Sequence, residues 1–546
     1  MSGLITRRRL LTAGATVPWL AACKDGTPPL EGGWLGAAHE RGHQLRNVKS
    51  GSLGTPAVER RAGVLVVGAG IAGLGCARAL ARHGIDDVQL LDLEDTPGGN
   101  SRGHAIAGMA CPLGAHYLPT PGDEATEVIA LLEELKLRRT EHGRTVYEER
   151  HLCHSPQERI FIEGAWHDGL LPPVDALPEA EHAQTLTQYR QFAAEVTAAS
   201  RSDGGPPAFA IPSARGAWGE TQAALDATTF AQWLDARGLT APALRWYLDY
   251  CCRDDYGAGA AQVSAWAGLH YFASRHGFHA PGSASDERDG VLTWPEGNAW
   301  LMQRLGEPVR DRLHTGRIAL RVRELRHGVE VDVLNAATTQ LERWTAPQVV
   351  LALPLFIAAR LVEQPGDALR DAARRMRHAP WLVANLHLDR PLVDRPGTLP
   401  AWDSVIYGSN GLGYVDAMHQ STRPHAGPTV LTAYVALGGD SAEQAAKQRA
   451  ALLSEPWTVW ASRVLDDLSA AHPDLRAKVR RVDLMRYGHA MSIPLPGIRS
   501  SAALQALSGR QARVHYAHAD LSGYSIFEEA LYHGERAAAD VRRLMG

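Results

Sequence analysis

Three glycines and one aspartate near the start of this chain are spaced in a way that could bind a ligand. Gly68, Gly70 and Gly73 form a G-x-G-x-x-G motif in the stretch VLVVGAGIAGLGCARALARHG, where Ala72 occupies one of the open positions. Glycines at this spacing allow a tight turn and let backbone amides approach a pyrophosphate closely. Asp92 lies 24 residues after Gly68, where a carboxylate can accept hydrogen bonds from a ribose. The spacing predicts a dinucleotide-binding site.

A strand, a helix and a second strand must hold these residues in register. The apolar run at 64–67 predicts a buried strand. Apolar residues recur at helical spacing from Ile71 to Leu80, and Gly84 suits the end of that helix. A second strand is predicted over 88–91, directly before the aspartate. These elements form a βαβ unit, so we expect an α/β fold with a Rossmann-like domain.

The residues after the aspartate resemble those of one particular family. Gly98 and Gly99 resemble the double-glycine motif of the flavin-containing amine oxidase superfamily, which includes phytoene desaturases and protoporphyrinogen oxidases. Asn100 stands where family members often have arginine, and Arg102 is nearby. Later stretches resemble further family motifs in their usual order: LGAHYLP, WPEGNAWLMQRL followed by IALRVREL, VVLALPL and YAHADLSGYSIFEEALYHGERAA. The resemblance spans about residues 64–540 and implies FAD as the cofactor.

The resemblance also implies which residues contact FAD. Beyond the glycine motifs and Asp92, the implied contacts lie at the flavin ring (Gly114, Ala115), at adenine (Val322), at the ribityl chain (Asp520) and at the pyrimidine (Phe527, Glu528, Ala530). The last three would begin a helix, although Glu529 stands where glycine is usual. A helix N-terminus at that place would stabilise negative charge on the reduced ring.

Because these motifs are far apart, both predicted domains are discontinuous. The FAD-binding domain would comprise 62–150, 287–356 and 485–546, and an α+β substrate domain, inserted in two pieces, would comprise 151–286 and 357–484. Helical spacing predicts helices near 180–200 and 227–239, with a long Gly- and Pro-rich loop at 201–216 between them. The alternating stretch WLVANLHL, from Trp381, predicts a strand over the flavin.

Seven residues are candidates for contact with a substrate: His116, Tyr117, Asp255, Tyr256, Asn385, Tyr487 and His489. The first two follow the predicted approach to the flavin ring. The polar patch in YCCRDDYG, which holds Asp255 and Tyr256, could bind a cationic group. RYGHAMSIPLPG, which holds Tyr487 and His489, resembles a segment beside the flavin. Each has an ordinary alternative: His116 can bond to the backbone, the patch can be a salt bridge, and Tyr487 and His489 can be core residues.

The chain departs from the family at one chemically important position. Many of the family's amine oxidases have a lysine on the strand over the flavin, linked through water to N5. Val383 falls near that position here, no lysine lies on the strand, and Asn385 is the nearest polar substitute. We see no cysteine in YGHAMSIP for covalent flavin attachment. His515 and His518 have no third ligand nearby, so we expect no metal.

The first 23 residues resemble an export signal. Arg7 and Arg8 precede a short apolar stretch, as in a twin-arginine signal, and this stretch is too short to span a membrane. Leu20-Ala21-Ala22-Cys23 resembles a lipobox, which predicts lipidation of Cys23. Twin-arginine export carries folded proteins, which suits a cofactor enclosed by distant segments. We therefore expect a periplasmic, membrane-anchored lipoprotein, with 24–61 as its tether.

Composition bounds the partners of the protein. The net charge of -4 argues against nucleic acid. Five cysteines besides Cys23, with no C-x-x-C pair, argue against a disulfide framework. The leading interpretation is an FAD-dependent oxidoreductase that oxidises a small amine, such as a polyamine, and passes electrons to oxygen or another acceptor. Alternatives are a desaturase or oxidase of a hydrophobic or cyclic substrate, and a non-catalytic, flavin-stabilised binding module.

Overall fold

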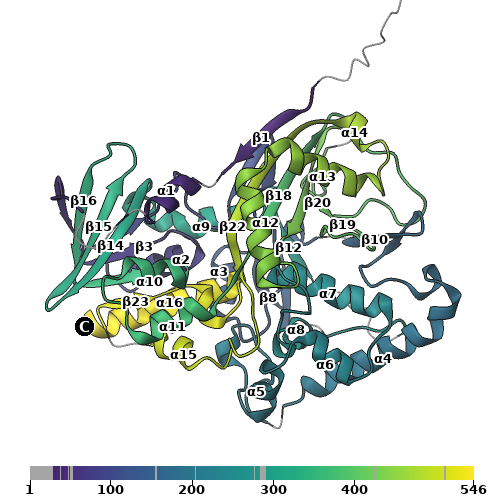
Figure 1. Ribbon diagram of the computed structural model, residues 1–546, viewed down its shortest axis with the longest axis horizontal. Helices are drawn as coiled ribbons and strands as arrows, with labels where there is room; N and C mark the ends of the chain where they lie inside the picture. The colour runs from purple at the N-terminus through teal and green to yellow at the C-terminus, as the bar shows by residue number, and fades with distance from the viewer. Residues whose placement is uncertain are drawn as a thin grey trace, which may run out of the picture.

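A five-stranded parallel sheet lies at the centre of the cofactor lobe (Figure 1). In spatial order its strands are β13 (Leu313–His314), β4 (Val88–Leu91), β3 (Val64–Val67), β17 (Gln348–Leu351) and β23 (Val514–Tyr516). The computed structural model describes residues 29–36, 38–46, 48, 53–153, 156–202, 204–275, 277–282, 290–423, 425–509 and 512–545. Within them, the predicted β3, α2 (Ile71–Arg82) and β4 are confirmed.

The two faces of this sheet are covered by different layers. Val64 and Val66 belong to one hydrophobic cluster with α2 and the long C-terminal helix α16 (Phe527–Met545). Leu65 and Val67 belong to another cluster, with the strands of a four-stranded sheet. Alternate residues of β3 therefore face opposite layers, which is why this strand is apolar throughout. The four strands, in spatial order, are β14 (Arg317–Leu325), β15 (Gly328–Asn335), β16 (Leu341–Ala346) and β2 (Val58–Arg61).

An eight-stranded mixed sheet forms the frame of the substrate lobe. Its strands, in spatial order, are β1 (Glu31–Leu35), β22 (Val479–Ser492), β18 (His378–Leu388), β21 (Thr429–Ala436), β20 (Tyr414–Asp416), β19 (Asp403–Ile406), β10 (Glu158–Ile162) and β11 (Ala165–Asp168). β18 contains the predicted strand WLVANLHL and pairs antiparallel with both β21 and β22. It is buried along almost its whole length, which agrees with its apolar sequence.

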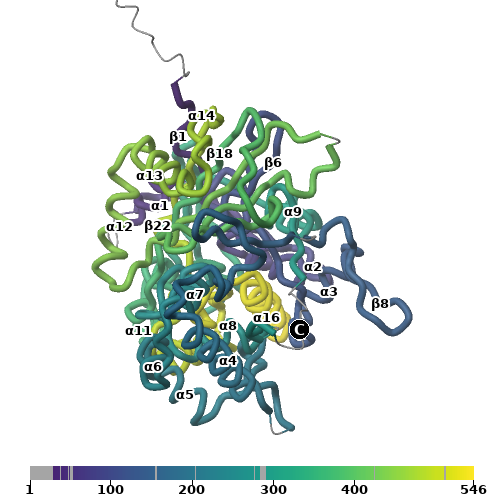
Figure 2. Tube along the Cα trace, turned by 90° about the vertical axis from the view of Figure 1, so that its right-hand side faces the viewer, coloured from purple at the N-terminus to yellow at the C-terminus, as the bar shows by residue number. Residues whose placement is uncertain are grey.

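Helices lie at both ends of this sheet. In two perpendicular views, α4–α8 gather at the opposite end of the lobe from β1, α13 and α14 (Figure 1; Figure 2). The first group comprises α4 (His182–Ala199), α5 (Glu220–Asp226), α6 (Phe230–Ala236), α7 (Pro242–Tyr256) and α8 (Ala265–Ala273). The second comprises α13 (Trp457–Ser469) and α14 (Leu475–Lys478), whereas α12 (Ala442–Ser454) packs against β18 and β22. α4 and α6 confirm the two predicted helices, and the segment between α4 and α5 is the expected long loop, with one short 3-10 turn.

The remaining elements connect the lobes or cover their edges. The helices are α1 (His39–Gln44), α3 (Thr126–Glu134), α9 (Ala299–Gly306), α10 (Leu355–Leu361), α11 (Asp367–Arg375) and α15 (Ala502–Leu507). The strand pairs are β5 (Gly103–Ile106) with β6 (Met109–Pro112), β7 (Tyr117–Pro119) with β12 (Val291–Thr293), and β8 (Arg138–Glu141) with β9 (Arg144–Tyr147).

Three predicted boundaries differ from the structure. The segment 24–61 is not simply a tether, because its strands β1 and β2 pair with β22 and β16. Residues 485–492, predicted in the cofactor domain, continue β22 in the substrate sheet. Residues 357–375, predicted in the substrate domain, lie in α10 and α11, whose apolar side chains join the cofactor-lobe core. Strand pairing and helix packing set these limits, and short motifs do not report them.

The predicted export signal, including Arg7, Arg8 and Cys23, lies outside the described residues. In the part of the chain that is described, no helix combines the length and the apolar character needed to cross a bilayer. Cys76, Cys111, Cys251 and Cys252 are free thiols.

Candidate functional site

A deep cavity runs from the turn after β3 to the large sheet of the substrate lobe. It encloses about 1710 Å³ of space between atoms, including its opening. Most of the predicted cofactor residues line it: Gly68, Gly70, Ala72, Asp92, Gly98, Gly99, Asn100, Gly114, Ala115, Phe527, Glu528 and Ala530. Segments that are hundreds of residues apart in the sequence therefore meet around one space.

Each glycine of the first turn has a different physical role. Gly68 has φ +103°, a conformation that a side chain would strain. A Cβ at Gly73 would lie 1.8 Å from the carbonyl oxygen of Gly68, so Gly73 serves helix packing and does not line the cavity. A Cβ at Gly70 would meet no atom nearer than the Cα of Gly99, 3.9 Å away. Folding does not require a glycine at 70, but close approach of a ligand would.

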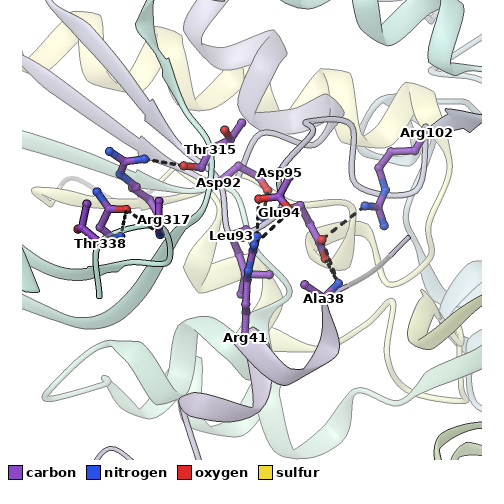
Figure 3. A network of polar contacts seen from close by, with 12 residues as sticks. Ala38, Arg41, Asp92, Leu93, Glu94, Asp95, Arg102, Thr315, Arg317 and Thr338 are labelled. Atoms are coloured by element: carbon purple, nitrogen blue, oxygen red, sulfur yellow. Dashed lines mark hydrogen bonds and ion pairs between the residues drawn. The ribbon is translucent and has the colours of Figure 1, made fainter. Parts of the chain in front are cut away.

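Asp92 is held in place at the end of β4. Its carboxylate accepts hydrogen bonds from the backbone amides of Ala69 (2.7 Å) and Glu94 (2.8 Å) while it lines the cavity. Burial raises the pKa of Asp92. Arg102 does not line the cavity: it donates to the carbonyl oxygen of Gly99 (3.1 Å) and lies 3.6 Å from the Glu94 carboxylate (Figure 3). Arg102 therefore supports the double-glycine turn from behind.

Two tyrosines of the large sheet fix the loop beside the predicted flavin ring. The Tyr487 hydroxyl donates to the carbonyl oxygen of Leu113 (2.8 Å), and the Tyr434 hydroxyl donates to that of Gly114 (3.0 Å). A Cβ at Gly114 would lie 2.1 Å from the carbonyl oxygen of Asn100. Gly114 is thus required for contact between two loops as well as for an open cavity. Tyr434 was not among the predicted site residues.

Asn298 and Asn385 also hold loop carbonyl groups next to the cavity through their side-chain amides. Asn298, from the WPEGNAWLMQRL motif, donates to the carbonyl oxygen of Tyr117 (2.9 Å) and lines the cavity. Asn385 lies outside the cavity lining and donates to the carbonyl oxygen of Pro112 (2.9 Å). The prediction that Asn385 replaces the family's lysine is therefore wrong in position, because its amide is engaged with a loop. Val383 on the same strand does line the cavity.

The N-terminus of α16 faces the cavity, as the resemblance implies. Phe527, Glu528 and Ala530 line it, and burial raises the pKa of Glu528 to about 7. The side chain of Glu529 is turned away and is fully buried. It accepts hydrogen bonds from the Ser213 amide (2.6 Å) and the Tyr524 hydroxyl (2.6 Å). The unusual glutamate therefore fixes the loop at 213 against the start of α16.

Besides Gly73 and Arg102, two more predicted cofactor residues lie outside the cavity lining, Val322 and Asp520. Val322 is buried in the core between sheets, and its carbonyl oxygen accepts a bond from the Glu363 amide (2.9 Å). Asp520 accepts bonds from the Leu355 amide (2.8 Å) and from His378 (3.0 Å). Burial opposes ionisation of Asp520, but its histidine neighbours hold its pKa well below the usual range. Asp520 therefore acts through His378, which does line the cavity.

Aromatic rings wall the part of the cavity that extends into the substrate lobe. His116 stacks on Tyr434, with ring centroids 4.3 Å apart, and meets the ring of Tyr117 edge-on at 4.9 Å. Trp381 from β18 lines the same chamber. Burial lowers the pKa of His116 to about 3, so this imidazole is neutral at physiological pH. We call the space that these four rings enclose the substrate chamber. The rings themselves present π faces and no positive charge.

The polar patch of α7 differs from its prediction. Asp255 forms a buried ion pair with Arg275 (3.1 Å), and Tyr256 donates to the carbonyl oxygen of Ala267 (2.8 Å) without lining the cavity. Asp254 lines the cavity, and in the described part of the chain no hydrogen bond or ion pair holds its carboxylate. Burial, and then the charge of Asp255, raises the pKa of Asp254 to about 7. The residue available to a ligand is therefore Asp254, which belongs to the predicted patch but was not singled out within it.

His489 lies where the cavity passes the end of β22. Its ring is 4.7 Å from that of Phe356, and burial together with the charge of Arg449 lowers its pKa to about 3. The structure brings six predicted substrate-contact and loop residues to one cavity: His116, Tyr117, Asp255, Tyr487, His489 and Asn100. It adds Asp254, Trp381 and Val383, which lie in stretches already noted, and Arg275, His378 and Tyr434, which lie in segments without a motif. Among the described residues, no group of histidine, cysteine or acidic side chains is arranged to hold a metal.

The described residues fit a flavin dinucleotide. Gly70 leaves room at a helix N-terminus where a pyrophosphate would bind, Asp92 lines the cavity where it could accept bonds from a ribose, and the first residues of α16 line the same cavity. Gly114 keeps the space between these ends open.

Comparisons with known proteins agree with this geometry. Residues 71–542 match the family described as "Flavin containing amine oxidoreductase". No curated protein sequence matches the chain. Among solved structures, cyclohexylamine oxidase from Brevibacterium oxydans IH-35A is 18% identical with a TM-score of 0.62, and a triple mutant of putrescine oxidase is 18% identical with a TM-score of 0.60. Each match covers 89% of this chain and 100% of the other.

A more distant structural match is a protein of Exiguobacterium sp. 255-15 described as a protoporphyrinogen oxidase. It is 14% identical with a TM-score of 0.56, and the match covers 90% of this chain and 100% of that one. At these identities the structural matches show the shared fold, whereas the family match spans most of the sequence. On that evidence, this chain belongs to the flavin-containing amine oxidoreductase family.

Proposed function

We propose that this protein binds FAD and oxidises a small amine. Bound FAD supplies the hydride acceptor at N5. The chain's own residues bind and orient the substrate and keep water from it. Tyr434 and Tyr487 fix the loop at Gly114, and the substrate chamber adjoins that loop.

The observation that carries the proposal is the character of the substrate chamber. Faces of Tyr434, Tyr117 and Trp381 attract an ammonium group through their π electrons. His116 is uncharged and does not repel a cation, because burial lowers its pKa to about 3. A cationic amine is therefore favoured over an anionic substrate at this place. Two of the structural matches are amine oxidases, putrescine oxidase and cyclohexylamine oxidase, which supports the same class.

A second candidate function is oxidation of a hydrophobic or cyclic substrate. Val383, Met491 and Ile526 also line the cavity, and these apolar side chains would suit a substrate without charge. The strand β18 contains no lysine, so it places no lysine charge beside such a substrate. This candidate explains the apolar lining, but it leaves the free carboxylate of Asp254 without a role.

Reduction of the bound flavin under anaerobic conditions tests both candidates. The purified holoenzyme is mixed with a panel of amines, and the flavin absorbance near 450 nm (about that wavelength for any flavin) is followed. Bleaching by amines supports the proposal. Bleaching only by lipid-like or cyclic substrates contradicts it in favour of the second candidate. A flavin that no compound reduces would indicate a binding module without catalysis.

We further propose that the protein is exported by the twin-arginine pathway and anchored in the periplasm through lipid on Cys23. The support is the sequence pattern at 6–23, together with a cofactor site assembled from residues between Gly68 and Ala530. Such a site requires folding before export. Replacing Arg7 and Arg8 by lysine should leave the protein in the cytoplasm, and Cys23→Ala should release it from membranes; periplasmic membrane attachment in both variants would contradict this.

A further inference from the structure

We propose that Asp254 forms a second cation subsite in the substrate chamber, so that the preferred substrate carries two ammonium groups. This inference rests on the proposed amine oxidation and deepens it. One amino group, having lost its proton, would present its α-carbon to the flavin beside Gly114, and the other, as an ammonium group, would pair with the Asp254 carboxylate.

Among the described residues, the acidic side chains along this part of the cavity wall outnumber the cations. Arg275 is the cation that lines the chamber here, and it is paired with Asp255 at 3.1 Å. Their side chains are only 12% and 6% exposed, so solvent screens this pair little. Asp254 is then a carboxylate in excess of the local positive charge.

The other nearby cation is directed elsewhere. Arg253 donates to the carboxylate of Asp249 (2.9 Å) and to the carbonyl oxygen of Asn410 (2.9 Å). In the described part of the chain, neither Arg253 nor Arg275 forms an ion pair with Asp254. Burying an uncompensated carboxylate is costly, and in the ligand-free protein Asp254 avoids that cost by holding its proton. A bound cation would supply the positive charge that the described residues do not give to the ionised form.

Acidic side chains on other elements also lie close to this place. Asp403 on β19 and Glu158 on β10 both interact electrostatically with Asp254. Burial, and then the charge of Asp254, raises the pKa of Asp403 well above its usual value. Tyr117 on β7 lies in the same field, and its phenol is neutral because burial raises its pKa. These neighbours disfavour an anion and favour a cation beside Asp254.

The position of α7 brings this carboxylate near the chamber wall. Gly257 ends α7 in the left-handed conformation, and a Cβ there would lie 2.6 Å from the indole nitrogen of Trp381. Asp254 is about one helical turn before this contact. Trp381 and Asp254 both line the cavity that contains Gly114. Asp254 also interacts electrostatically with Tyr117 and Tyr434. Tyr434 is bonded to the carbonyl oxygen of Gly114, so we expect a short flexible diamine to reach both the flavin side and the acidic side.

The test compares putrescine with butylamine on the holoenzyme and on two variants. Asp254→Asn keeps the size of the side chain and removes its charge. Asp311→Asn, an exposed aspartate in the cofactor lobe, is the matched control. We expect the wild type and the control to prefer putrescine in apparent Kd for anaerobic flavin reduction by on the order of tenfold or more, which is typical of a bond to a buried charge. Asp254→Asn should lose that preference, with butylamine little changed.

Each outcome decides between the inference and the function on which it rests. Equal affinity for both amines in the wild type, or a preference that survives in Asp254→Asn, overturns the subsite. If no amine reduces the flavin, the proposed function fails, and calorimetric titration of putrescine into the oxidised holoenzyme tests the subsite alone. Binding that Asp254→Asn abolishes then supports it, and absence of binding overturns it. Flavin content and Tm verify that each variant is folded.

Discussion

The backbone amide of Ala38 donates a hydrogen bond to the carboxylate of Glu94, 56 residues away in the sequence, at 3.1 Å (Figure 3). Arg41 adds bonds to the carboxylate of Asp95 (2.8 Å) and to the carbonyl oxygen of Leu93 (3.0 Å). The strand β1, just before this contact, pairs with β22 of the substrate sheet. The N-terminal segment therefore ties the two lobes together beside Asp92.

This contact predicts that Arg41→Ala loosens the cofactor. Loss of the bonds to Leu93 and Asp95 should free the loop that holds Asp92, and flavin release should accelerate by about fivefold, as expected for one partly exposed charge contact of ~1 kcal/mol. Flavin fluorescence after dilution measures the rate. Arg61→Ala, at an exposed position of β2, should release flavin at the wild-type rate. Equal rates for all three proteins would show that the segment does not help to hold the cofactor.

The glycine turn predicts two different failures from similar substitutions. Gly70→Ala should fold, because no protein atom comes within 3.9 Å of the added Cβ, but the methyl group should exclude the cofactor and leave the protein colourless. Gly73→Ala places its Cβ against the Gly68 carbonyl oxygen and should lower the stability of the apoprotein by about 1–3 kcal/mol or more. Flavin content and the Tm of the apoprotein separate the two. A yellow Gly70→Ala protein would contradict the assigned role of this glycine.

Much of the cofactor site could be predicted because its requirements are local. The turn at Gly68 and the acid at Asp92 belong to one βαβ unit, whose strands and helix have clear hydrophobic periodicity. The N-terminus of α16 was likewise marked by a short motif. For Val322 and Asp520, a family motif predicted a direct contact with the cofactor. In the structure, Val322 is bonded to neighbouring backbone and Asp520 to a histidine.

The substrate side could not be predicted in the same way, because its residues meet only through tertiary packing. Tyr434 lies on an apolar strand with no distinguishing pattern, and its role depends on the distant carbonyl oxygen of Gly114. In the patch on α7, sequence alone could not tell which acid is free, because the partner of Asp255 is Arg275, 20 residues further along the chain. Likewise β1 is recognised only by its pairing with β22.

Glu529, which stands where the family usually has glycine, is predicted to stabilise the folded protein. Glu529→Ala should leave the Ser213 amide and the Tyr524 hydroxyl without their acceptor, and two unpaired buried groups should lower the free energy of unfolding by about 2–4 kcal/mol. Glu529→Gln retains one oxygen acceptor and should cost less. Urea unfolding of the holoprotein measures both. Equal stability of the alanine variant and the wild type would mean that water replaces the carboxylate.

The raised pKa of Asp254 predicts that, as pH rises, the stability of the protein decreases while its affinity for a diamine increases. Its pKa is about 7 in the folded, ligand-free protein, above the ordinary value of 3.8, so the folded state holds this proton in a range where the unfolded chain has lost it. The contribution of Asp254 to stability therefore falls as pH rises from about 4 to 7, by about 1.4 kcal/mol for each unit of pKa difference at most. Asp254→Asn should have the Tm of the wild type near pH 4 and a higher Tm at pH 8.

Affinity should follow the opposite course. Ionised Asp254 attracts a diamine, so the apparent Kd of putrescine should decrease as pH rises through about 7 in the wild type and should show no such step in Asp254→Asn. Glu528 also titrates near 7, and Glu528→Gln should retain the step if Asp254 is responsible. A step that disappears in Glu528→Gln but persists in Asp254→Asn would assign the pH dependence to the start of α16 and not to the chamber wall.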